Sequence, residues 1–217
     1  MGFFDFLKGK QEKEKSDRKG EIGYLRLKEW FNGLSKVEKD KVRKYYSMGL
    51  SDSKSLESEE ITFSTSNQQK FLGTIGQNAL SQKDFSFAET ILLEALQSKD
   101  DNPMDRHFVY NSLIDLYYKK RDSSDAIEKC IKYCLEDIKY FEDFKKAWER
   151  EFGDELPRIP SFERLAIIYE KQGKFEEAIE ICQMALKLGL KSSRKGGFEG
   201  RINKLQKKLN KSTTMKK

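Results

Sequence analysis

The residue types that most often perform chemistry are scarce in this chain of 217 residues. His107 is the single histidine, and no serine or cysteine stands out as the nucleophile of a catalytic triad. Cys130 and Cys134 are four residues apart, so on a helix they share one face and can supply two zinc ligands. No second ligand pair follows at a suitable spacing. We therefore predict a protein that is not an enzyme and that holds no metal or cofactor.

Basic residues near the C-terminus form a second group that could bind a ligand. Gly196 and Gly197 precede a helical pattern, and backbone N–H groups at such a turn can bind an anion. Two interpretations stay open, an anion site and a tight turn into the helix. The candidate contacts to an anion or to nucleic acid are Arg194, Lys195, Arg201, Lys204 and Lys208.

The net charge of +6 is concentrated in the same region. Ten lysines or arginines and one acid, Glu199, lie between residues 191 and 217, so the preceding part of the chain is net acidic. Such a tail either is solvated or contacts phosphates in a salt-dependent way. Phe198 is the single aromatic residue there, which gives little material for stacking on bases.

The elements that position these residues are predicted to be helical hairpins. Residues 161–190 contain two apolar patterns of helical spacing, separated by Gly173. Phe162, Leu165, Ala166 and Tyr169 form the first pattern, and Ala178, Ile179, Cys182, Ala185 and Leu186 form the second. Neither helix can bury its apolar face alone, so the two must pair.

This spacing resembles the tetratricopeptide repeat, with Phe162, Ala166 and Cys182 at the positions of its Trp, Gly and Phe. The tail after it is similar to that of bacterial repeat proteins of unassigned function. The resemblance implies an all-α fold, a TPR-like solenoid of helical hairpins with about three repeats, an N-terminal helical cap and a C-terminal capping helix. We expect a repeat domain over 66–210, made of 66–99, 106–153, 160–190 and the capping helix 198–210. Around it we expect a flexible N-terminus (1–20), a helical cap and loop (21–65) and a disordered basic tail (211–217).

Two local patterns refine this outline. Ser35 with Glu38, and Ser66 with Gln69, have the spacing of capping boxes at helix starts. The second repeat is longer than the family pattern, and its apolar spacing continues to Phe152, which predicts one extended helix over residues 124–152. Its aromatic residues, Phe141, Phe144, Trp148 and Phe152, would pack against the last repeat, the C-terminal helix or a second copy of the chain. A homodimer through this helix is one of these alternatives.

The resemblance also implies a function, the binding of a peptide or helix in the groove lined by the first helix of each hairpin. The predicted partner-binding positions are Lys70, Gln77, Asn111, Asp115, Tyr118, Lys119, Glu163, Ile167, Glu170 and Lys171. Gly73 and Gln77 depart from the pattern that binds C-terminal carboxylates in some family members. A groove filled by residues 21–48 of the chain itself is the alternative. A regulatory, nucleic-acid-associated protein that uses the basic tail is the alternative function.

Features of localisation agree with a cytoplasmic protein. No segment approaches the roughly 20 apolar residues of a membrane helix, so we expect no stable membrane insertion. The N-terminal residues Met1 to Lys10 are unlike a secretory signal, because an acid interrupts a short apolar patch. They are interpreted either as a frayed end or as a short amphipathic anchor.

Overall fold

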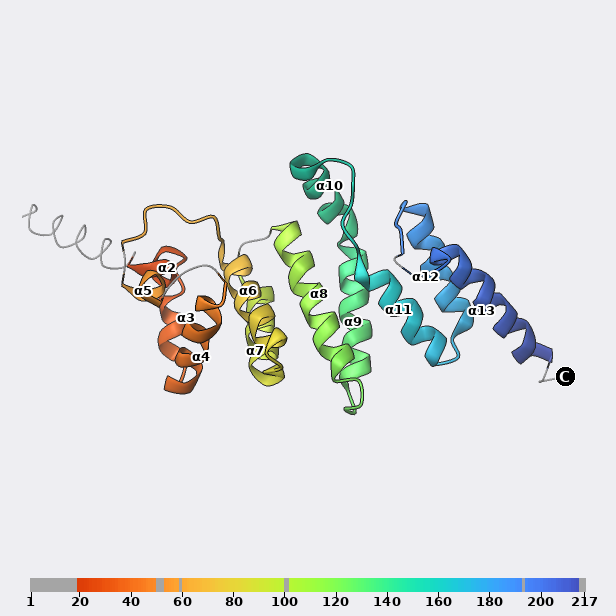
Figure 1. Ribbon diagram of the computed structural model, residues 1–217, viewed down its shortest axis with the longest axis horizontal. Helices are drawn as coiled ribbons and strands as arrows, with labels where there is room; N and C mark the ends of the chain where they lie inside the picture. Colours follow the sequence, from red (N-terminus) through yellow and green to blue (C-terminus); the bar gives the residue numbers. More distant parts are fainter. Residues whose placement is uncertain (1–18, 50–52, 59, 100–101, 193, 215–217) are drawn as a thin grey trace, which may run out of the picture. The chain divides into compact units, whose positions relative to one another are not determined.

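The computed structural model describes residues 19–49, 53–58, 60–99, 102–192 and 194–214 (Figure 1). All regular elements in these segments are helices, with one isolated bridge between Lys19 and Glu60, which confirms the all-α class. The chain divides into two compact units, residues 1–112 and 113–217, with the boundary inside one helix. No helix in the described part of the chain is long and apolar enough to cross a membrane.

Within the described residues of the N-terminal unit, four short helices precede the first hairpin. They are α2 (Gly20–Tyr24), α3 (Lys28–Gly33), α4 (Lys36–Ser47) and α5 (Ser53–Glu57), and the hairpin consists of α6 (Gln68–Ser81) and α7 (Phe85–Gln97). α8 (Pro103–Lys119) begins in this unit and ends in the next. The short α5 lies in a segment expected to be a loop.

Residues of α4 pack on the first hairpin. The ring of Tyr45 lies 5.7 Å from that of Phe87 on α7, and Tyr46 lies 5.8 Å from Phe71 on α6. The predicted groove positions Lys70 and Gln77 nevertheless remain exposed. Helices from residues 21–48 therefore support this hairpin without covering those two positions.

Helix starts in this unit match one of the two predicted capping boxes. Ser35 and Glu38 form the reciprocal box at the start of α4. The second prediction is wrong, because Asn67 caps α6 by accepting a hydrogen bond from the backbone N–H of Lys70 at 2.8 Å. Gln69 is instead fully buried and donates from its side chain to the carbonyl of Ala95 at 3.2 Å.

The C-terminal unit contains the end of α8 and the remaining five helices. These are α9 (Ala126–Lys139), α10 (Phe141–Phe152), α11 (Pro160–Lys171), α12 (Phe175–Lys187) and α13 (Gly197–Thr214). Tyr117 on α8 stacks on Tyr133 on α9 at a centroid distance of 5.6 Å. α11 and α12 form the hairpin expected from the sequence, and Gly173 makes its turn with a φ of +75°, a conformation that favours glycine.

The prediction of one extended helix over 124–152 is wrong. α9 ends at Lys139, and α10 begins one residue after the turn at Tyr140. The change of direction lets Phe141 pack edge-on against Phe162 of α11 at 5.7 Å and buries Phe144 as well. Tertiary packing of aromatic rings thus breaks a helical pattern that contains neither proline nor glycine.

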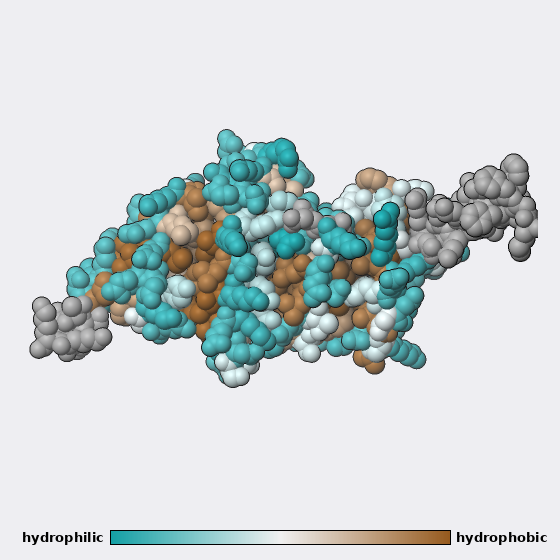
Figure 2. All heavy atoms as spheres, turned by 180° about the vertical axis from the view of Figure 1, so that it is seen from behind, coloured by the Kyte–Doolittle hydropathy of each residue, from teal (hydrophilic) through white to brown (hydrophobic). Residues whose placement is uncertain are grey.

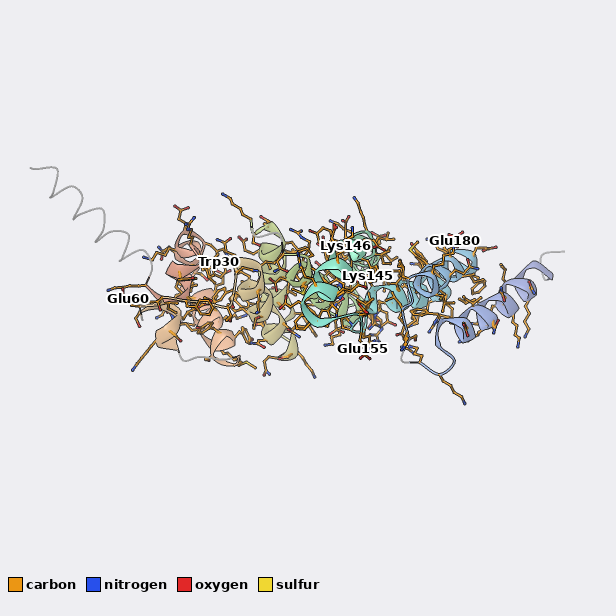
Figure 3. The ribbon with its side chains drawn as sticks, turned by 90° about the horizontal axis from the view of Figure 1, so that it is seen from above. Trp30, Glu60, Lys145, Lys146, Glu155 and Glu180 are labelled. Atoms are coloured by element: carbon orange, nitrogen blue, oxygen red, sulfur yellow. The ribbon has the colours of Figure 1, made fainter. Side chains whose placement is uncertain are left out.

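Of the three surfaces proposed to cover these aromatic residues, the last hairpin covers Phe141. The indole N–H of Trp148 donates to the main-chain carbonyl of Glu155 at 3.0 Å. This bond ties α10 to the following loop, in which Glu155 is labelled in Figure 3. Phe152 remains 58% exposed. A homodimer through this region stays a prediction, with two of its four aromatic residues already buried.

α13 packs on the last hairpin through Phe198 and Leu205, both buried. It runs to Thr214, so residues 211–214 are helical and do not belong to a disordered tail. Hydrophilic residues cover most of the face seen in Figure 2, and hydrophobic residues gather in narrow bands between them. The expectations for residues 1–18 and 215–217 lie outside the described residues.

Candidate functional site

Two groups of residues that the sequence predicted separately lie together in the C-terminal unit. A cavity of about 370 Å³ is lined by side chains from α8, α11 and α13 and from the segment before α13. Its lining residues are Tyr118, Ile167, Glu170, Lys171, Arg194, Arg201, Lys204 and Lys208. We call this cavity the basic groove. Four of the predicted partner-binding positions and four of the five predicted anion contacts therefore form one site.

Glu170 is the centre of the charge arrangement in the basic groove. Its carboxylate accepts from Arg201 at 2.5 Å and from Lys208 at 2.8 Å, and Lys204 lies at 3.2 Å. The three cations recur every three or four residues, so they share one face of α13. Burial raises the pKa of the Glu170 carboxyl, but hydrogen bonds from Lys208 and Lys204 outweigh burial. The pKa of this carboxyl therefore lies below its ordinary value of 4.5. Glu170 is therefore ionised at neutral pH.

Tyr118 forms the aromatic wall of the groove. The guanidinium of Arg164 lies 3.6 Å from the ring centroid, and the Lys171 ammonium donates to the phenol oxygen at 3.3 Å. Although burial raises the pKa of the phenol, the hydrogen bond from Lys171 and the charge of Arg164 lower it below 10.0 overall. Arg164 was not predicted, but it precedes Ile167 by three residues and Lys171 by seven on one helix face, a spacing from which its place can be inferred.

Glu163 differs from the prediction that it faces a partner. Its side chain is 5% exposed and pairs with two arginines, Arg158 at 3.4 Å and Arg194 at a shorter distance. Its carboxylate therefore contacts the chain itself. Since Arg194 also lines the basic groove, Glu163 acts by positioning that guanidinium.

The other predicted positions lie outside the lining. Asp115 and Lys119 form an ion pair with each other at 2.7 Å on α8. Lys70, Gln77 and Asn111 belong to the N-terminal unit. Exposed Lys195 does not reach the cavity.

The glycine pair before α13 makes a turn. Gly196 and Gly197 have φ values of +82° and +62°, and the N–H of Gly197 donates to the carbonyl of Arg194 at 2.9 Å. This donor therefore completes a turn and is not directed at an anion. The turn brings Arg194 and Arg201 to the same cavity.

The residues with potential for catalysis or metal binding are buried. His107 is 1% exposed, and its Nε2 lies 3.0 Å from the side-chain nitrogen of Asn111. All three cysteines are buried thiols, and burial raises the pKa of Cys182 to about 11. Within the described segments, no cluster of three or more metal-binding side chains occurs. Among the described residues, none forms a metal-binding cluster with Cys130 and Cys134, and a zinc site usually has four ligands.

A second cavity, of about 500 Å³, lies beside the loop between α10 and α11. Its charged lining residues are Lys145, Arg158, Lys191, Glu149, Asp154 and Glu155. Cations and carboxylates balance there, whereas the basic groove has five cations and one carboxylate. Of these two cavities, the basic groove is the one with a clear preference for one sign of ligand charge.

Comparison with known proteins identifies a relative. An uncharacterized protein of Aquifex aeolicus (strain VF5) is 32% identical over 181 residues, which cover 80% of this chain and 87% of the relative. No protein-family profile and no solved structure matches the chain.

Proposed function

We propose that this chain, which belongs to one family with the uncharacterized Aquifex aeolicus protein, is a non-catalytic protein-interaction module built from TPR-like hairpins. The observation that carries the proposal is the basic groove, where aromatic Tyr118, aliphatic Ile167 and five cationic side chains line one cavity. An apolar lining with a few convergent charged groups is the usual composition of a binding site.

The hairpins support the TPR-like part of the proposal. The second helix of each hairpin has a buried alanine near its start, and these residues are Ala88, Ala126 and Ala178. Small residues at helix crossings allow close packing of the two helices in a hairpin. α6 packs on α7 and α11 on α12, while Tyr117 and Tyr133 join α8 to α9.

Side-chain accessibility favours binding over catalysis. The imidazole of His107 and the three thiols are buried, and none of them lines the groove. The groove itself offers ammonium, guanidinium and phenol groups, which recognise a ligand through charge and hydrogen bonds.

The test compares two matched variants of the full chain. Ile167→Ser removes an aliphatic side chain from the groove, and Leu186→Ser removes one that is 37% exposed on α12, outside the groove. Both tagged variants and the original chain would be used to capture partners from the native cell. We expect Ile167→Ser to lose partners that Leu186→Ser retains, and equal retention by both would contradict the proposal.

Regulation through nucleic acid is the second candidate, and the excess of cations in the groove is the observation that favours it. α13 turns Arg201, Lys204 and Lys208 toward Glu170 of its own unit. That arrangement concentrates charge in a cavity, whereas a nucleic-acid backbone needs a longer basic track. The protein ligand is therefore our first proposal.

A further inference from the structure

The basic groove holds more positive charge than its own carboxylate neutralises. Arg201, Lys204 and Lys208 all approach Glu170. Lys171 adds a further cation to the lining, whereas Arg194 is already paired with Glu163. An ammonium has three N–H donors, and the Lys204 and Lys208 side chains are 63% and 43% exposed. Both lysines therefore keep donors available to a ligand while they contact Glu170.

The solvent exposure of these charged groups determines how strongly they attract a ligand. Glu170 and Arg201 are only 11% and 15% exposed, so the centre of the groove is partly shielded from water. Charges in such a setting are screened less than charges on an open surface. A ligand carboxylate near Lys204 and Lys208 is thus attracted by an excess of positive charge that solvent screens only partly.

The aromatic wall argues against nucleic acid as the ligand. Base stacking needs an accessible aromatic face, but Arg164 lies 3.6 Å from the Tyr118 ring centroid. Arg121 and Lys171 also lie over this ring, at 5.4 and 5.6 Å. The ring is therefore engaged by cations of the chain itself. Ile167 is left as the apolar contact, which suits an aliphatic side chain.

We infer that the basic groove binds an acidic segment of a partner protein, with glutamate or aspartate side chains at Lys204, Lys208 and Lys171 and an aliphatic residue at Ile167. This inference rests on the proposed function and specifies the chemistry of the partner. The cations come mainly from α13 and the segment before it, so a free C-terminal carboxylate is not required.

The test uses the full chain and a short fluorescein-labelled peptide of glutamates with interspersed leucines, with an amidated C-terminus. A copy with glutamine in place of every glutamate is the matched control peptide. We expect the glutamate peptide alone to bind, and its affinity to fall as NaCl is raised from about 0.05 M to about 0.5 M. Equal binding of both peptides would overturn the inference.

Variants of α13 locate the contact. We expect Lys204→Gln combined with Lys208→Gln to weaken binding of the glutamate peptide about three- to tenfold, from the strength of partly exposed ion pairs. Lys207→Gln makes the same chemical change at an exposed position outside the lining and should change affinity less than about twofold. Equal affinities for the two variants would refute the location.

Lys171→Gln guards against a merely structural effect, because this exposed lysine lies on α11 and its hydrogen bond goes to the Tyr118 phenol. This substitution should also weaken binding of the glutamate peptide, and unchanged binding would contradict the assignment of Lys171 as a contact residue. A single-stranded oligonucleotide that bound more tightly than this peptide at equal salt would replace the acidic segment as ligand class. Loss of native partners in Ile167→Ser without any binding of the glutamate peptide would leave the interaction module intact and refute only the acidic partner.

Discussion

Glu170 joins the last hairpin to the capping helix, and its replacement tests the charge arrangement of the groove directly. In Glu170→Gln the carboxylate that faces three cations of α13 is lost, while the shape of the side chain is kept. Arg201, which is 15% exposed, is left as a largely buried cation without a counter-charge. We expect α13 to be held less firmly on α11 and α12.

The magnitude follows from the exposure of each pair. A hydrogen bond between charged groups, such as that of Arg201, contributes about 1.5–3 kcal/mol. The half-exposed lysines add about 0.2–1 kcal/mol each, and glutamine keeps part of the hydrogen bonding. We expect the free energy of unfolding of the C-terminal unit to fall by about 2–3 kcal/mol.

Urea unfolding and hydrogen exchange of the α13 amides measure this change. Glu180→Gln is the matched control, because Glu180 is exposed on α12 (Figure 3), and it should alter stability by less than about 0.5 kcal/mol. A loss below that value in Glu170→Gln, or unchanged exchange in α13, would refute the role of Glu170.

The pH dependence of stability tests the role of Glu170 independently. The pKa of the Glu170 carboxyl is lowered below 4.5 in the folded chain, so its stabilisation is fully present above pH 4.5. It is lost as pH falls through the lowered pKa, where the carboxyl is protonated in both states. The stability difference between the original chain and Glu170→Gln should therefore be constant near neutral pH and shrink in acid. A difference that grew in acid would contradict the assignment.

Two substitutions, one of them with a matched control, and one chemical modification test the packing. Gly76→Ala places a Cβ 2.6 Å from Leu92 Cγ and should destabilise by about 1–2 kcal/mol in urea unfolding, whereas Gly33→Ala meets nothing within 4 Å and should be neutral or stabilising. Phe141→Ala removes the edge-on contact of α10 with α11 and should cost about 3–5 kcal/mol by the same measurement. Since burial raises the pKa of Cys182 to about 11, its alkylation by iodoacetamide at pH 8 should be slow in the folded chain and rapid in urea; equal rates would show that the thiol is accessible.

The sequence was sufficient for the helices whose apolar stripes face one partner. Phe162, Leu165 and Ala166 recur at helical spacing and are all buried in α11. The turn at Tyr140 was not predictable in this way, because neither proline nor glycine marks it and the pattern of apolar residues continues through it. The contact of Phe141 with Phe162 decides that turn, and such contacts between distant residues leave no periodic signal.

The sequence predicted most residues of the basic groove but not the contact that brings them together. Groove positions on α11 were implied by the resemblance to the tetratricopeptide repeat, and basic positions on α13 followed from composition, but nothing local linked the two groups. Their link is Glu170, predicted to face a partner and found to contact Arg201 of the same chain. Glu163 was misplaced similarly, because a carboxylate that pairs with Arg194 within the chain has the same spacing as one offered to a ligand.

Glu170 also explains how a groove with so much positive charge is compatible with a stable fold. Three cations on one face of α13 repel one another, and packing that helix beside Lys171 without a carboxylate would add to this repulsion. The carboxylate of Glu170 offsets enough of the charge to hold α13, as the hydrogen bonds from Arg201 and Lys208 indicate. A second carboxylate would neutralise the groove further and weaken its attraction for an acidic segment. Since Arg194 is paired with Glu163, the other four cations of the lining face the one carboxylate of Glu170. This arrangement keeps α13 in place and leaves net positive charge for a ligand.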